Sequence, residues 1–213
     1  AEYRGLLQQA SVLGVPNERF FPMTGIEGLS AEFMSAAERR ARHDGLRSTA
    51  ELAVEFLAVS GGGEDGAFGA GLLCGWSEHG DRPVFELVTG VSTGALTAPF
   101  AFLGPKYDAQ LRHVYTEVPP ARILRPRGIT AALFDDALAD NSPLFGTISS
   151  VLDQRMLDDI AVAYKEGRLL LVGTTNLDAQ QPVIWNIGAI AASGHPKALD
   201  TVRRVLLASA AIP

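Results

Sequence analysis

The sequence has 213 residues, of which 47% are hydrophobic, and its 18 basic and 24 acidic residues give a net charge of −6. That length and apolar content suit one domain with a sizeable core, and a charge balance without a dense basic run argues against a nucleic-acid partner. The single cysteine, Cys74, excludes an internal disulfide framework. No apolar stretch approaches the ~20 residues that a membrane span requires.

The two ends of the sequence give two expectations. Because the chain begins with Ala1 rather than Met, we expect that an initiating segment has been removed. Because its last eight residues form an apolar run into a turn, we expect the natural chain to continue beyond Pro213.

The first fifty residues differ in character from the rest. Residues 1–28 show no periodicity and predict an extended arm, whereas 30–51 predict a charged helix with Ser30 as its N-cap and an interruption at Gly45. We therefore expect an N-terminal arm and helix over 1–52 that pack on a main domain over 53–213.

The main domain alternates between apolar runs and helical segments. Residues 56–60 and 85–89 predict buried strands, and each runs through a glycine turn into a helix, over 66–76 and 95–102. This alternation predicts an α/β fold with a parallel sheet. Proline-interrupted helices are predicted over 107–116, 129–138 and 153–166, with Pro143 as one of the breaks, and two strands and a last helix over 168–175, 183–187 and 196–207.

The turn after the second predicted strand carries the pattern Gly90-Val91-Ser92-Thr93-Gly94. A sharp turn from strand to helix needs small residues around its apex, which Gly90 and Gly94 supply. The turn presents the apical hydroxyl beside a helix N-terminus, where developing negative charge is stabilised. An ordinary tight turn would also give this pattern, but its place between a strand and a helix favours Ser92 as a nucleophile.

Three consecutive glycines, Gly61, Gly62 and Gly63, follow the first of these strands. Their backbone amides can turn towards one point without side-chain obstruction, as the oxyanion of an acyl transfer requires. A flexible connection is the simpler alternative. The glycines also fit a dinucleotide fingerprint that ends at Gly66, but that fingerprint needs an acid at the end of the next strand, and Glu86 lies in the middle of it.

Together these segments resemble the patatin-like phospholipase family of acyl hydrolases, in its bacterial type. The matching stretches are residues 60–71, 89–95, 174–178 with 183–188, and 208–213. The resemblance implies a three-layer α/β/α fold with a largely parallel central sheet, and a Ser–Asp dyad without a catalytic histidine. It assigns Ser92 as the nucleophile, Gly61, Gly62 and Gly63 as the oxyanion loop, and residues 53–213 as the acyl hydrolase domain.

The activity that the resemblance implies is that of a carboxylic ester hydrolase. Family members hydrolyse acyl esters of phospholipids, lysophospholipids or other lipids, so the expected partner is a lipid substrate, with contact to a membrane surface left open. No cofactor is implied, and no paired His, Cys or Asp spacing indicates a metal site. Bacterial members often begin as lipoproteins or exported proteins, so an envelope location fits, as does a cytoplasmic one.

Two departures from the family pattern bear on activity. Asp65 stands where the family's glycine loop often carries Arg or Lys. The dyad aspartate normally belongs to an Asp-Gly-Gly or Asp-Gly-Ala motif beyond the Ala-Ser-x-Ala-x-Pro segment, so we expect it after Pro213 and expect the domain to be incomplete at that end. These departures leave a catalytically inactive lipid-binding or scaffold protein of the same fold as the main alternative, with a nucleotide-binding α/β protein behind it.

Several other residues are candidates for the same chemistry. Asp178 follows the strongest predicted strand and is a candidate base, and His195 is the candidate for a Ser–His–Asp triad, although each fits a structural role better. Cys74 lies on a helix of small residues and is expected in the core. The remaining candidates are expected on solvated faces, loops or caps: His43, His79, His113, Asp135, Asp136, Asp140, Asp153, Asp158 and Asp159.

Overall fold

The computed structural model describes residues 11–116, 125–126, 139–140 and 142–211 of the chain. Its helices are α2 (Glu27–His43), α3 (Gly66–His79), α4 (Thr93–Leu103), α5 (Asp108–Thr116), α6 (Ser142–Val151), α7 (Gln154–Lys165), α8 (Ile187–Ala192) and α9 (Ala198–Ala210). Its strands are β1 (Arg19–Phe20), β2 (Phe56–Val59), β3 (Leu87–Val91), β4 (Arg125–Pro126), β5 (Ala139–Asp140), β6 (Leu169–Asn176) and β7 (Gln181–Asn186). Single 3₁₀ turns lie at Thr49–Glu51, Gly63–Asp65 and Pro105–Tyr107.

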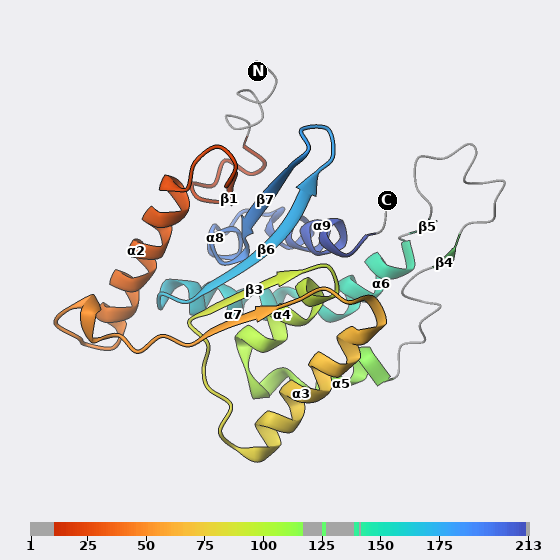
Figure 1. The fold of residues 1–213 in the computed structure, drawn as a ribbon, viewed down its shortest axis with the longest axis horizontal. Helices are drawn as coiled ribbons and strands as arrows, with labels where there is room; N and C mark the ends of the chain where they lie inside the picture. The colour runs from red at the N-terminus through yellow and green to blue at the C-terminus, as the bar shows by residue number, and fades with distance from the viewer. Residues whose placement is uncertain (1–10, 117–124, 127–138, 141, 212–213) are drawn as a thin grey trace.

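Five strands form one mixed sheet in the order β1-β7-β6-β3-β2 (Figure 1). The pairs β2–β3 and β3–β6 are parallel, whereas β7 and β1 add to the sheet antiparallel. Helices pack on both sides, so the predicted α/β/α fold with a largely parallel centre is confirmed. Gly90 pairs with Val59 on one side and Val172 on the other, so the carboxyl ends of the three parallel strands lie at one edge of the sheet.

Helix α4 packs on this sheet and is largely buried. Ala95 and Ala98 are fully buried beside Val88 of β3, because their small side chains let the helix approach the strand closely. Cys74 of α3 belongs to the same core, as predicted, and burial raises the pKa of its thiol above the ordinary value. Within the described part of the chain, no helix is both long and apolar enough to cross a membrane.

Two predicted helix boundaries are wrong. Helix α2 begins at Glu27, and the amide of Ser30 donates to Ile26 O at 2.8 Å, so Ser30 lies inside the helix rather than at its N-cap. Pro143 was expected to break a helix but is the second residue of α6, because the first turn of a helix needs no amide hydrogen there. The helix predicted over 129–138 lies outside the described residues.

The N-terminal segment packs on the main domain through a buried carboxylate. Glu32 of α2, only 2% exposed, accepts hydrogen bonds from Arg39 Nη2 at 3.0 Å and from Tyr164 Oη of α7 at 2.8 Å. Asn17 Nδ2 donates to the same carboxylate at 2.9 Å. These bonds satisfy a charge that burial would otherwise penalise. The division of the chain at residue 52 stays a prediction.

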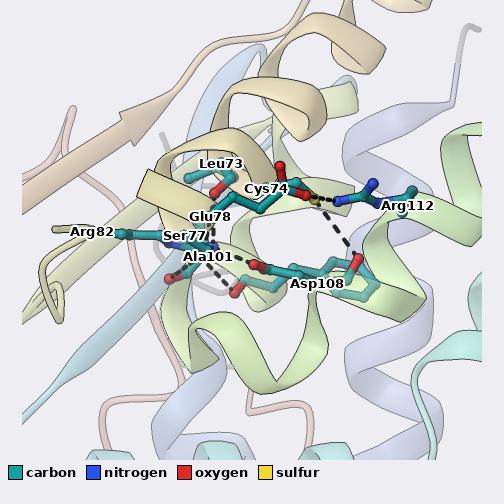
Figure 2. A network of polar contacts seen from close by, with 9 residues as sticks. Leu73, Cys74, Ser77, Glu78, Arg82, Ala101, Asp108 and Arg112 are labelled. Atoms are coloured by element: carbon teal, nitrogen blue, oxygen red, sulfur yellow. Dashed lines mark hydrogen bonds and ion pairs between the residues drawn. The ribbon is translucent and has the colours of Figure 1, made fainter. Parts of the chain in front are cut away.

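Two buried arginines bind the C-terminal end of α4. Figure 2 shows the first, Arg82, which donates to Asp108 Oδ1 at 2.9 Å and to the carbonyls of Phe100 and Ala101 at 3.2 Å each. The second, Arg168, donates to the carbonyl of Phe102. A helix leaves its last carbonyls without partners inside the helix, and these guanidinium groups supply them.

Candidate active site

Ser92 lies at the apex of the turn that joins β3 to α4. Its backbone angles, φ 56° and ψ −129°, fall in a region that residues other than glycine rarely occupy. Such a conformation costs of order 1–3 kcal/mol and persists only where the surrounding structure holds it in place. Ser92 is therefore a strained residue at the N-terminus of a helix, and its side chain is half-buried.

The glycines on either side of Ser92 are required by close packing. A Cβ on Gly94 would lie 2.2 Å from Val59 O and 2.6 Å from Ser60 O. A Cβ on Gly90 would lie 2.6 Å from Gly94 O. All three distances are too short for any side chain, so Gly94 lets the turn fit against the end of β2, and Gly90 lets α4 begin close to β3.

The glycine loop after β2 lies directly against this turn. A Cβ on Gly61 would lie 2.9 Å from Ser92 Cβ and 3.5 Å from Ser92 Oγ. Thr93 Oγ1 donates a hydrogen bond to Gly63 O at 3.0 Å, and Gly63 takes a φ of 54°. The structure thus brings Ser92 together with Gly61, Gly62 and Gly63 at the carboxyl edge of the parallel strands. At this edge β2 leads into α3 and β3 leads into α4 (Figure 1).

The backbone amides of the loop are open to solvent. Gly61, Gly62 and Gly63 are all exposed, and among the described residues no acceptor binds the N–H of Gly62 or Gly63. Asp65 ends the loop as the N-cap residue of α3, where its side chain is exposed and makes no capping hydrogen bond. An acid is favourable at a helix N-terminus, which gives Asp65 a local structural role.

Two further hydroxyl groups lie at this turn, and the sequence did not single out either for a role. Ser209 of α9 accepts a hydrogen bond from the Ser92 amide at 2.9 Å. The hydroxyl of Tyr115, on α5, is hydrogen-bonded to Thr97 Oγ1 of α4 at 2.8 Å. Burial raises the pKa of Tyr115. Ser209 had a sequence signal, its place in the family-like segment 208–213. Tyr115 had none, because an aromatic residue on an amphipathic helix is ordinary.

The alternative bases and acids lie elsewhere. Asp178 is exposed in the turn between β6 and β7. His195 precedes α9, and its Nδ1 accepts from the Lys197 amide at 3.1 Å. Ser209 lies at the other end of that helix, which is about 20 Å long by its helical rise. In the part of the chain that the structure describes, no carboxylate or imidazole is hydrogen-bonded to Ser92 Oγ.

The remaining polar candidates have structural roles or lie outside the described residues. Asp153 caps α7 through the Met156 amide at 2.8 Å, and Asp159 binds Lys106 Nζ at 2.7 Å. His79 pairs with Asp81 on the surface. Among the residues with described side chains, no group of three or more His, Cys, Asp or Glu could hold a metal ion. Asp135 and Asp136 are not among the described residues.

The dinucleotide alternative does not fit this arrangement. Glu86 immediately precedes β3, at the opposite end of the strand from the glycine loop, and its carboxylate accepts from the Glu55 amide at 2.8 Å. A ribose-binding acid must instead follow the strand, on the side of the glycine loop. On the side of α4, this loop instead contacts Ser92 through Gly61 and Thr93 through Gly63.

Comparison with known protein families supports the resemblance. The family model described as patatin-like phospholipase matches residues 57–213, a range that includes β2, the glycine loop, the Ser92 turn and α9. A comparison with curated proteins gave no match.

Proposed function

The chain belongs to the patatin-like phospholipase family, and on that premise we propose that it hydrolyses acyl esters of lipids through an acyl-enzyme at Ser92. The family implies lipid acyl hydrolase activity. The observation that carries the finer assignment is the strained Ser92 turn with an open glycine loop packed against it. Strain of this kind at a strand-to-helix turn is typical of a nucleophilic serine.

The chemistry follows from the positions of these groups. Ser92 Oγ attacks the ester carbonyl carbon while its proton passes to a base, and the carbonyl oxygen becomes an oxyanion. The free amides of Gly62 and Gly63, together with the N-terminus of α4, stabilise that charge. Collapse of the intermediate expels the alcohol with the proton from the base, and water then releases the acid. We assign the base to the aspartate of the Ser–Asp dyad that the resemblance implies.

The surface of α3 supports a lipid substrate. Phe68 is 76% exposed and Leu72 57% exposed, and residues 66–76 of this helix carry no charged side chain. Gly66, two residues before Phe68, touches Thr93 beside the nucleophile. Exposed apolar side chains on the helix that follows the glycine loop suit contact with acyl chains, either of a bound lipid or of a membrane surface.

A fluorophosphonate probe tests the assignment, because it reacts covalently with activated serines. We expect the protein to be labelled at Ser92, labelling to be lost in Ser92→Ala, and labelling to be kept in Ser60→Ala, which removes the exposed serine just before the glycine loop. Labelling that persists in Ser92→Ala would contradict the proposal. Vesicle binding without any labelling would favour the inactive lipid-binding alternative.

A further inference from the structure

One side chain from a distant part of the sequence holds the Ser92 turn. Ser209, on the last turn of α9, lies 117 residues from Ser92 in the chain. The Ser92 amide donates to Ser209 Oγ at 2.9 Å, and that hydroxyl donates to Gly173 O of β6 at 2.7 Å. An amide can only donate and a carbonyl can only accept, so the direction of both bonds is fixed. One hydroxyl therefore joins the turn, the sheet and α9.

The bond to Ser209 completes the constraints on the strained residue. On the other side of Ser92, its carbonyl accepts from the Ala95 amide at 2.9 Å, within the first turn of α4. Both peptide groups that flank Ser92 are thus hydrogen-bonded, which fixes the rotations about its φ and ψ. A strained conformation persists only when its surroundings determine it in this way.

The hydroxyl of Ser209 is used differently from the hydroxyls of three other serine and threonine residues on helices. Ser77, Thr116 and Thr147 each donate to the carbonyl four residues earlier in their own helix, which is the usual local partner. Ser209 instead points out of its helix to bind two other elements. Its contribution is therefore directed at the Ser92 turn rather than at α9.

From this geometry we propose that Ser209 is a positioning residue, which keeps the Ser92 backbone in its strained conformation and so aims Oγ towards the side of the glycine loop. The proposal rests on the proposed function of Ser92. Without the hydroxyl, the Ser92 amide loses its hydrogen bond to α9, and φ can relax. A small displacement of a nucleophile lowers the rate by about tenfold to a hundredfold.

The test compares three variants of Ser209 in the full protein. Ser209→Ala removes the hydroxyl, Ser209→Cys keeps nearly the same shape with a weak hydrogen-bonding group, and Ser209→Thr keeps the hydroxyl. We expect the rate constant of fluorophosphonate labelling and kcat to fall about tenfold to a hundredfold in the Ala and Cys variants. KM should change little, and Ser209→Thr should restore most of the rate. The control is Ser150→Ala, an exposed serine of α6 that bonds only locally, to Thr147 O at 2.8 Å.

A second measurement separates this proposal from the assignment of Ser92. Hydrogen exchange of the Ser92 amide should be faster in Ser209→Ala than in the wild type, and unchanged in Ser150→Ala. Normal exchange or a normal labelling rate in Ser209→Ala would overturn the proposal, as would a Thr variant as slow as the Ala variant. If the wild type is not labelled at all, the proposed function fails, and exchange alone then decides whether Ser209 holds the turn.

Discussion

The two ends of α4 are built in opposite ways. At its N-terminus, Ser92 is strained and half-exposed, and uncharged hydroxyl groups of Thr93 and Ser209 make the contacts to the glycine loop and to the Ser92 amide. At its C-terminus, the last carbonyls accept hydrogen bonds from Arg82 (Figure 2) and from Arg168. The Arg82 side chain is only 1% exposed. One end is open and neutral, and the other is buried and cationic.

The C-terminal end of α4 thus serves stability, whereas its N-terminal end carries the proposed reactivity. A cation near a helix C-terminus is favourable, and both arginines also satisfy carbonyls that would otherwise lack partners. Burial lowers the pKa of Arg168 to about 10, so it stays charged at neutral pH. At the N-terminus a fixed negative charge would compete with the proposed oxyanion for the same backbone amides. The stabilising charges are therefore placed where they do not touch the proposed chemistry.

The largest effect is expected at the buried end. Arg168→Met leaves the carbonyls of Phe85 and Phe102 without their donor, and should lower the free energy of unfolding by about 2–4 kcal/mol, because unsatisfied buried acceptors cost about 1–3 kcal/mol each. Labelling per folded molecule should not change. Urea unfolding measures the first quantity, and probe labelling at low temperature the second.

A surface arginine supplies the control for this prediction. Arg204 is 69% exposed at its side chain, pairs with Asp200 and lies 5.7 Å from the ring centre of Phe145, so Arg204→Met should change stability by less than about 0.5 kcal/mol. If Arg168→Met were equally mild, or slowed labelling of the folded protein, the proposed separation between the two ends would be wrong.

A smaller effect, of the opposite kind, is expected at the open end. Thr93→Val removes the hydroxyl that holds Gly63 O but keeps the side-chain shape. Labelling and ester hydrolysis should fall about tenfold, because misplaced oxyanion donors lose part of a contribution of about 10²–10³, while stability changes by about 1 kcal/mol or less. Thr147→Val, which removes a local bond in α6, is the matched control. A loss of stability without a loss of rate would contradict the assignment of Thr93 to the site.

The smallest effect concerns Asp65. Because this exposed acid lies at the end of the glycine loop, Asp65→Arg should raise the rate with an anionic lipid about threefold, with less change for a neutral ester, as expected for a solvent-screened charge. It should also cost about 0.3–1 kcal/mol of stability at the α3 N-terminus. Asp65→Asn removes the negative charge without adding a positive one, so it separates these two effects on the rate. Equal rates for all three proteins with the anionic lipid would show that residue 65 does not act on the site.

The local parts of the fold could be predicted from the sequence. Each glycine turn follows an apolar run and opens a helix, and that order alone indicated β2, α3, β3 and α4 within a few residues. The glycines around Ser92 were also predictable, because close approach of strand and helix allows nothing larger. The prediction that Pro143 breaks a helix was wrong, because a proline that begins a helix and one that ends it look alike in a sequence.

The contacts that cross the sequence could not be predicted in the same way. Ser209 meets the Ser92 turn only because α9 packs against β6 and α4. In the sequence, Arg82 and Arg168 cannot be told from ordinary surface charges, because the α4 carbonyls that they bind are distant along the chain. The catalytic roles of Ser92 and of the glycine loop stay predictions, since they depend on reactivity rather than on position.

Detection of the acyl-enzyme tests most directly whether Ser92 is the nucleophile. Rapid acid quenching during hydrolysis of a p-nitrophenyl ester, followed by peptide mass analysis, would show which residue carries the acyl group. We predict that the acyl mass appears on the peptide that contains Ser92, in the first turnover, and is absent in Ser92→Ala. Ester hydrolysis at a normal rate with no acyl group on that peptide would contradict the central claim.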